Sequence, residues 1–298
     1  MIAVVPVRDG QLPNGAVDAV RAADGHALLV GTAVTDAVGG LDGHASTVVL
    51  AEAAGPFARL VTTLAAAVAG HHVVVLPTSP DGRDLAPALA HALGRPLLPG
   101  ALTVTADGAS CTRWGGRVVE DVHVNGPFVV TLQPSSGTTR GERGAPTITE
   151  IGLAADAAPS PRVRAVLPPD VTSMDLSEAG RIVGGGAGLD AAERFTLLQD
   201  VAAAMGAAMG GTRVITDRGW IAHERQIGTT GVVVRPHLYL AFGVSGAVQH
   251  TSGLGDPDHV ISVNTDPHCP MMQLAYIALV ADANATVAAL ADRLGVTP

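Results

Sequence analysis

The chain has 298 residues, 47% hydrophobic and only 3% aromatic, which allows one large domain or two ordinary ones with a core of small aliphatic side chains. Its net charge of −9, without a cluster of Lys and Arg, argues against nucleic-acid binding, which needs a basic surface. We find no signal peptide, no apolar run of the roughly 18 residues that a membrane span needs, and no metal-binding pair of cysteines, so we expect a soluble, cytoplasmic protein without a metal.

The first half of the chain alternates short apolar runs with segments of helical periodicity. The expected strands lie at 2–7, 27–31, 47–52 and 72–76, and the expected helices at 15–23, 57–69 and 84–93. This alternation predicts βαβ units around a parallel sheet. In residues 101–132, turn signals at 107–108, 115–116 and 125–127 separate short β-type runs, so we expect hairpins that close this domain.

A polar loop at 134–146 and a linker at 154–169 with four prolines separate the two halves. We place the boundary near Pro168, giving domains 1–168 and 169–298. The second half repeats the pattern, with expected strands at 181–183, 213–216, 238–242, 260–263 and 278–280, a glycine turn at 184–188, and helices at 191–209 and 286–294. The fold class is therefore α/β with two doubly wound domains, the second Rossmann-like.

Two segments of the second domain have residues suited to an anionic ligand. The glycine turn 184–188 allows a backbone to approach a pyrophosphate at a helix amino terminus, although such turns also occur for packing alone. Arg213 follows Gly210-Gly211-Thr212 at the start of an apolar run. It is either a cation facing a ligand at the carboxyl end of the sheet or a strand-edge arginine that reaches solvent.

Three polar turns follow. The loop 226–231 carries Gln, two Thr and two Gly, and taken alone it is better explained as an ordinary polar turn than as a ligand site. After the apolar strand 238–242, Ser245 is placed to cap a short helix that contains His250. Asn264 and Asp266 end the next strand, as such residues also do in proteins without a ligand.

The order and spacing of these segments are more specific than any one of them. The stretches "DRGWIAHERQIGTTG", "RPHLYLAFGVSGAVQH" and "VISVNTDP" resemble signatures of the alpha subunit of electron transfer flavoproteins, and "VVVLPTSPDGRDLAPALAHALGRPL" is similar to that family's amino-terminal pattern. The resemblance covers most of the chain and is weakest over the first 45 residues. It implies an electron transfer flavoprotein alpha/beta-type domain followed by an FAD-binding domain.

The resemblance also implies which residues bind FAD. It assigns Arg213 to the isoalloxazine, the Thr230 hydroxyl to flavin N5, His250 to the C2 carbonyl, and Asn264 and Asp282 to the adenosine side. The turn Ser245, Gly246, Ala247, Val248 and Gln249 is assigned to the ribityl-phosphate region. The remaining expected contacts are Gly186, Thr212, Gln226, Ile227, Gly228 and Thr229.

The sequence departs from the family pattern at three positions. Ala187 replaces the usual Arg in the glycine turn, Thr229 a usual Gln, and Tyr276 a usual Asp. The missing Arg removes a charge-assisted phosphate contact of about 1.5–3 kcal/mol. Thr212 keeps the hydroxyl of the usual Ser.

The family resemblance implies an electron carrier and not an enzyme with its own substrate. The flavin would supply the redox chemistry, with electrons arriving from a partner dehydrogenase and leaving to a downstream acceptor such as a quinone oxidoreductase. It also implies a heterodimer with the beta subunit of the same flavoprotein. Two alternatives remain open at this point: a flavin- or NAD-dependent oxidoreductase with its own substrate, and a non-catalytic nucleotide-binding module.

Overall fold

The computed structural model describes residues 1–113, 118–134, 141–154, 164, 170–255 and 257–296. The chain divides into two compact units, Met1–Val166 and Leu167–Pro298. The turn expected at 115–116, most of the expected linker and the boundary near Pro168 lie outside the described residues.

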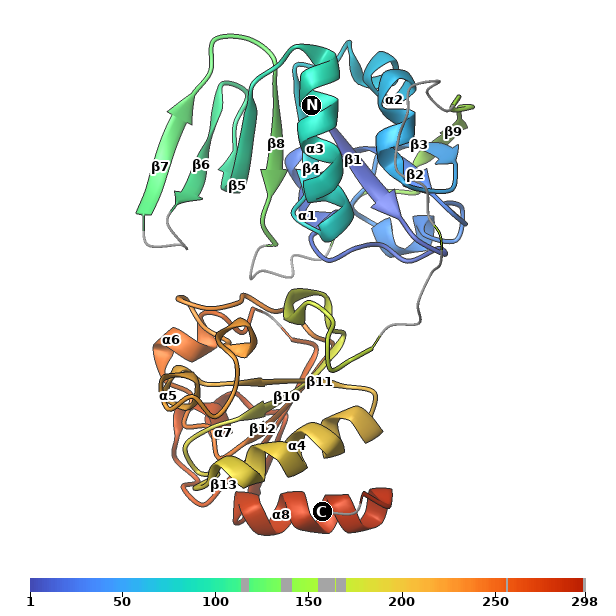
Figure 1. The fold of residues 1–298 in the computed structure, drawn as a ribbon. Helices are drawn as coiled ribbons and strands as arrows, with labels where there is room; N and C mark the ends of the chain where they lie inside the picture. The colour runs from blue at the N-terminus through green and yellow to red at the C-terminus, as the bar shows by residue number, and fades with distance from the viewer. Residues whose placement is uncertain (114–117, 135–140, 155–163, 165–169, 256, 297–298) are drawn as a thin grey trace. The chain divides into compact units, whose positions relative to one another are not determined.

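The first unit is a mixed sheet covered by helices on both faces (Figure 1). Among the described residues the strand order is β7-β6-β5-β8-β4-β1-β2-β3-β9. The strands are β1 Ile2–Val7, β2 His26–Gly31, β3 Thr47–Glu52, β4 Val73–Pro77, β5 Leu97–Val104, β6 Gly108–Arg113, β7 Val118–His123, β8 Phe128–Leu132 and β9 Thr147–Glu150. The helices are α1 Ala16–Ala22, α2 Val61–Val68 and α3 Pro80–Leu93, with 3₁₀ helices η1 Val38–Leu41 and η2 Phe57–Leu60.

The central strands are buried on both faces, which is why they read as continuous apolar runs. In β1, Ala3, Val5 and Val7 belong to the core under α1, whereas Ile2 and Val4 belong to the core under α2 and α3. The alternation of side chains along a strand thus supplies both layers from one run.

The expected hairpins are confirmed only in part. β6 pairs antiparallel with β5 and with β7. β8, however, is parallel to both β4 and β5, between which it lies. The prediction of a closing hairpin at 125–127 is therefore wrong, because the wholly buried run of β8 gains more by entering the centre of the sheet than by pairing with its sequence neighbour. The exposed edge strand β9 was not foreseen.

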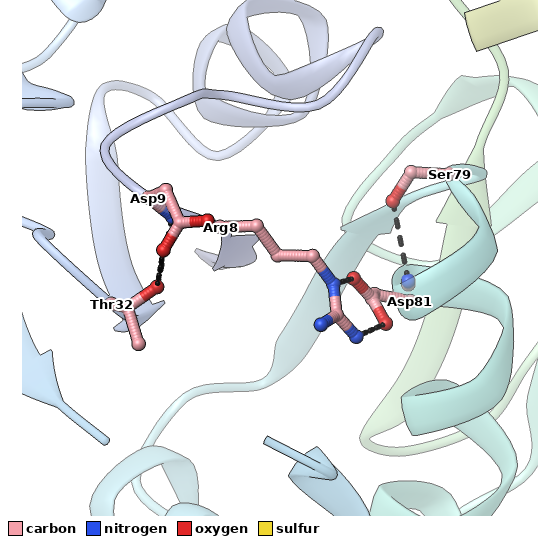
Figure 2. A network of polar contacts seen from close by, with 6 residues as sticks. Arg8, Asp9, Thr32, Ser79 and Asp81 are labelled. Carbon is pink, nitrogen blue, oxygen red and sulfur yellow. Dashed lines mark hydrogen bonds and ion pairs between the residues drawn. The ribbon is translucent and has the colours of Figure 1, made fainter. Parts of the chain in front are cut away.

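In the first sheet the winding reverses between β1 and β4, since β2 and β3 follow on one side of β1 and β4 lies on the other. Doubly wound sheets usually bind a ligand at this position. There Arg8, just after β1, donates to both carboxylate oxygens of Asp81 in the first turn of α3, at 2.5 and 2.7 Å (Figure 2). Ser79 caps α3 by accepting from the Gly82 amide at 3.2 Å. The switch point of the first unit is thus bridged by a bidentate ion pair.

The second unit has a parallel sheet of order β11-β10-β12-β13-β14. The strands are β10 Arg181–Gly185, β11 Ala208–Gly211, β12 Leu238–Phe242, β13 His259–Asn264 and β14 Ile277–Val280. The helices are α4 Ala192–Ala204, α5 Arg213–Asp217, α6 Val248–Thr251, α7 Pro270–Leu274 and α8 Ala283–Leu294, with 3₁₀ helices η3 Leu176–Glu178 and η4 His223–Arg225. Helices α4 and α8 lie side by side on one face (Figure 1). The two doubly wound α/β units confirm the predicted fold class.

Two expectations for residues 191–216 are wrong. The helix expected to reach 209 ends at Ala204, and the chain turns at Gly206, whose φ is +63°, into β11. The strand expected at 213–216 is helix α5. The strand consists instead of Ala-Met-Gly-Gly, where a Cβ on Gly210 would lie 2.8 Å from Ile227 Cδ1 and one on Gly211 2.5 Å from Ile221 Cδ1. Close packing against these side chains accounts for two glycines inside a strand.

β14 forms an edge of the second sheet, and all four of its residues are exposed. Apolar side chains exposed on or beside it are Leu274, Tyr276, Ile277, Leu279 and Val280.

Among the described helices, none is long and apolar enough to cross a bilayer.

Candidate functional site

The second sheet reverses its winding between β10 and β12, and the turns that follow these strands pack against each other. Gly186 N donates to Phe242 O and Gly188 N to Gly243 O, both at 3.0 Å. A Cβ on Gly186 would lie 2.3 Å from Gly243 O. Close approach of the two turns therefore explains Gly186, while Ala187 points to solvent.

The loop that contains Gln226–Thr230 lies at the same end of the sheet, beside the end of β11. Gln226 pairs with Gly211 as a parallel bridge, and Ile227 N donates to Gly211 O at 2.9 Å. The Gln226 side chain is buried and lies 2.9 Å from Thr230 Oγ1 and 2.6 Å from Thr216 Oγ1. Thr229 and Thr230 are exposed. The loop thus exposes the hydroxyls of Thr229 and Thr230, and the buried amide of Gln226 holds the loop in place from the inside.

Helix α6 lies against the same loop. Thr229 N donates to Gln249 O at 2.9 Å. The backbones approach so closely that a Cβ on Gly253 would lie 2.4 Å from Gly228 Cα. The Gln226–Thr230 loop and residues 249–253 therefore form one closely packed assembly.

His250 connects this assembly to the sheet. Its Nδ1 lies 3.1 Å from Ile227 O and its Nε2 lies 2.8 Å from the hydroxyl of Tyr239 on β12. A carbonyl oxygen only accepts, so Nδ1 carries the proton, Nε2 accepts, and Tyr239 donates. Burial lowers the pKa of His250 to about 4, against a smaller opposing effect of the Ile227 carbonyl, and burial raises the pKa of Tyr239. His250 is therefore neutral, with both ring nitrogens engaged inside the protein.

The turn after β12 differs from expectation at its helix cap. The amino-terminal cap of α6 is Ala247 and not Ser245. Ser245, Ala247, Val248 and Gln249 are exposed, whereas Gly246 is buried with φ +81°, and a Cβ there would lie 2.4 Å from Met271 N. Gly246 thereby turns the chain so that Ser245 faces solvent.

Arg213 does not begin a buried strand. It is the first residue of α5, after the cap residue Thr212, and its Nε lies 3.3 Å from Asp217 Oδ2. The two side chains are 65% and 62% exposed. Arg213 is therefore an exposed cation at the start of a helix and not the first residue of a strand, and the ion pair stabilises the fold little, because water screens it. The guanidinium remains available to a ligand at this edge.

Asn264, the last residue of β13, and Asp282, which follows β14, lie along the same edge. Asn264 Nδ2 donates to Val244 O at 3.0 Å, which ties β13 to the turn after β12. Asp282 is exposed and caps α8 by accepting from Ala285 N at 2.8 Å. The structure thus brings Asn264 next to the Ser245 turn, with Asp282 one strand further out.

Two residues of the site were not predicted from the sequence. Thr216 belonged to an expected strand, and its helical position beside Gln226 is visible only in the structure. Tyr239 carries the one polar side-chain group in the strand Leu-Tyr-Leu-Ala-Phe. A hydroxyl inside a largely buried strand requires a partner, and that requirement was the available signal.

The edge suits a long, polar, anionic ligand. Exposed Thr230, Ser245 and Gln249 offer neutral hydrogen-bonding groups, and Arg213 offers a permanent cation. Within the described ranges, no group of three or more His, Cys, Asp or Glu side chains could hold a metal ion.

Comparisons with known proteins relate the chain to electron transfer flavoproteins. The family described as "Electron transfer flavoprotein FAD-binding domain" matches residues 175–255. The electron transfer flavoprotein subunit alpha of Paracoccus denitrificans is 31% identical over 246 residues, 81% of this chain and 78% of that protein. That of Syntrophomonas wolfei is 34% identical over 220 residues, 72% and 69% of the two chains. Protein FixB of Bradyrhizobium diazoefficiens is 35% identical over 230 residues, 73% and 62%.

Proposed function

Because the chain belongs to the electron transfer flavoprotein alpha-subunit family, we propose that its carboxyl-terminal unit binds FAD along the edge described above and that the chain carries electrons without turning over a substrate of its own. The observation that carries the proposal is the convergence of the Gln226–Thr230 loop and the turns after β10 and β12 on one end of the sheet. A bound FAD supplies the redox chemistry.

The protein's own groups bind and orient. Arg213 supplies positive charge, and Thr230 supplies a hydroxyl whose position is set by Gln226. Ser245, with its neighbours in the turn after β12, and the edge residues Asn264 and Asp282 hold the remainder of the ligand. Arg213 stabilises negative charge on the ligand, because an arginine does not lose its proton.

We propose for His250 a role that differs from the one implied by the family resemblance. Both of its ring nitrogens already have partners, and the side chain is 4% exposed. We propose that His250 fixes the Gln226–Thr230 loop against β12 and acts on the ligand through that loop. The basis is the carbonyl that accepts from Nδ1, which belongs to Ile227 inside the loop.

We further propose that the chain pairs with the beta subunit of an electron transfer flavoprotein in the cytoplasm, receives electrons from a dehydrogenase and passes them to a downstream acceptor. In this arrangement residues 1–168 form the alpha/beta-type domain and residues 169–298 the FAD domain. Names of the relatives support the subunit pairing, since each of the two alpha-subunit relatives is itself one subunit. The apolar side chains exposed on β14 are a surface that association would remove from water.

Co-expression with a candidate beta subunit tests the proposal. We expect a yellow complex of the two chains, identified by its absorbance and mass, that accepts electrons only when a dehydrogenase is supplied. A monodisperse monomer with FAD and full electron-transfer activity would contradict the pairing. Turnover of a small substrate without any dehydrogenase would favour the oxidoreductase alternative, and a colourless protein would favour the nucleotide-binding module.

A further inference from the structure

The buried amide of Gln226 lies between two hydroxyls. One end of the carboxamide is 2.9 Å from Thr230 Oγ1 and the other is 2.6 Å from Thr216 Oγ1. Gln226 is 1% exposed, so no water competes for these contacts. Thr230, in contrast, is exposed at the edge where the ligand is proposed to bind.

Counting protons shows that this chain has two satisfied arrangements. The Thr216 hydroxyl has one proton and two acceptors in reach, Gln226 Oε1 and the carbonyl oxygen of Arg213 at 2.9 Å. If Thr216 donates to Gln226, the amide nitrogen donates to Thr230, and the proton of Thr230 is free to point outward.

In the second arrangement the carboxamide is rotated by half a turn, which exchanges its oxygen and nitrogen, and the 2.6 Å contact with Thr216 lengthens by about 0.2–0.3 Å because an N–H donor lies farther from its acceptor than an O–H donor. Thr216 then donates to the Arg213 carbonyl and accepts from the amide nitrogen. Thr230 donates inward to the amide oxygen, and its lone pair points outward. Each end of the amide keeps a threonine partner in both arrangements, and in the first arrangement the proton of the exposed Thr230 is left for solvent or ligand, so neither arrangement leaves a buried end of the amide without a partner.

We propose that Gln226 is a reversible positioning residue, whose two amide orientations let Thr230 either donate to or accept from the ligand. The proposal rests on the proposed function and on the family resemblance, which assigns the Thr230 hydroxyl to flavin N5. That nitrogen is an acceptor in the oxidised ring and carries a proton in the fully reduced ring. The carboxamide therefore matches both states without a charged group and without any covalent change in Gln226 or Thr230; the proton on the ring nitrogen of the reduced flavin comes from solvent.

An amide that only pins the loop would behave differently, because it would keep one orientation throughout. The two roles can be distinguished by which threonine methyl group, that of Thr230 or that of Thr216, lies close to the Gln226 amide protons. In the first arrangement the Gln226 amide protons point at Thr230, and in the second they point at Thr216.

The test uses the FAD-loaded complex, deuterated and labelled with protonated threonine methyl groups and with ¹⁵N in the glutamine side chains. We expect the nuclear Overhauser contact of the Gln226 amide protons to move from the Thr230 methyl to the Thr216 methyl when the flavin is reduced. An unchanged contact partner overturns the proposal. Failure of the complex to bind FAD would instead contradict the proposed function.

A variant gives a second measurement. Gln226→Glu, when its carboxylate is ionised, only accepts, so Thr230 must donate inward and oxidised FAD loses its donor. We expect its affinity for oxidised FAD relative to reduced FAD to fall about 2- to 10-fold. The ¹³C shift of the introduced carboxyl group identifies the pH range in which the ratio is read, and Gln199→Glu, at an exposed site on α4, is the matched control. An unchanged ratio with an ionised carboxylate would overturn the proposal.

Discussion

Removing the hydroxyl of Tyr239 tests the core of the site directly. Tyr239 is fully buried, and its hydroxyl donates to His250 Nε2 at 2.8 Å. Tyr239→Phe keeps the ring but leaves a buried imidazole nitrogen without a donor. We expect the free energy of unfolding to fall by about 1–3 kcal/mol, the cost of an unsatisfied buried polar group.

The same pair makes stability depend on pH. The pKa of His250 is about 4 in the folded protein, so the unfolded chain takes up a proton at higher pH than the folded chain does. Its contribution is therefore present above pH about 6.5 and is lost as the pH falls towards 4, by up to about 3 kcal/mol. In Tyr239→Phe the donor that favours neutral imidazole is gone, which raises the pKa of His250 and reduces this loss.

Urea unfolding at pH 7 and at pH 4.5 measures both effects. Tyr276→Phe is the matched control, since the Tyr276 side chain is exposed and its loss should change the unfolding free energy by less than about 0.5 kcal/mol. Equal stability of Tyr239→Phe and the wild type at pH 7, or the same fall on acidification in both, would refute the assigned proton positions.

Three further outcomes follow from the site. Arg213→Ala should leave the unfolding free energy within about 1 kcal/mol of wild type, because the ion pair is exposed. The same variant should lower the reduction potential of bound FAD, measured by potentiometric titration. An unchanged potential would make Arg213 a surface residue without a role toward the ligand. Ala187→Arg should tighten FAD binding in a fluorescence titration if the exposed turn faces the phosphates, and equal or weaker binding would show that it does not. Gly184→Ala should destabilise by about 1–3 kcal/mol in urea, because its Cβ would lie 2.0 Å from the Tyr239 hydroxyl, whereas Gly70→Ala meets nothing within 4 Å and should be neutral.

Much of the fold was predictable because burial leaves a direct trace in sequence. Strands such as β1 and β4 are buried at every residue, so they form apolar runs. β11 could not be recognised in this way, because its Ala-Met-Gly-Gly run is shaped by the side chains of Ile221 and Ile227, which come later in the chain. β8 had a clear strand pattern, but its place between β4 and β5 depends on long-range pairing that no local signal encodes.

The site divides in the same way. The loop with Gln226 and Thr230 was identified by its composition and by the family resemblance. The state of His250 was not, because it depends on which groups meet its two nitrogens across the fold. Arg213 was assigned to a strand because the apolar pair Val214-Ile215 suggested one, and the only helix-start signal, Thr212 at the cap position, was given less weight.

The unpaired edge of β14 bears on how much of this chain a cell can make. A strand at the end of a sheet offers its backbone groups to any extended segment, and a second copy of the same chain serves as readily as another protein. Chains synthesised in excess of a covering partner would therefore meet one another first. Balanced production of the two components would then limit loss to aggregates, so the ratio of the two chains, and not only the amount of either, would set the yield of working protein.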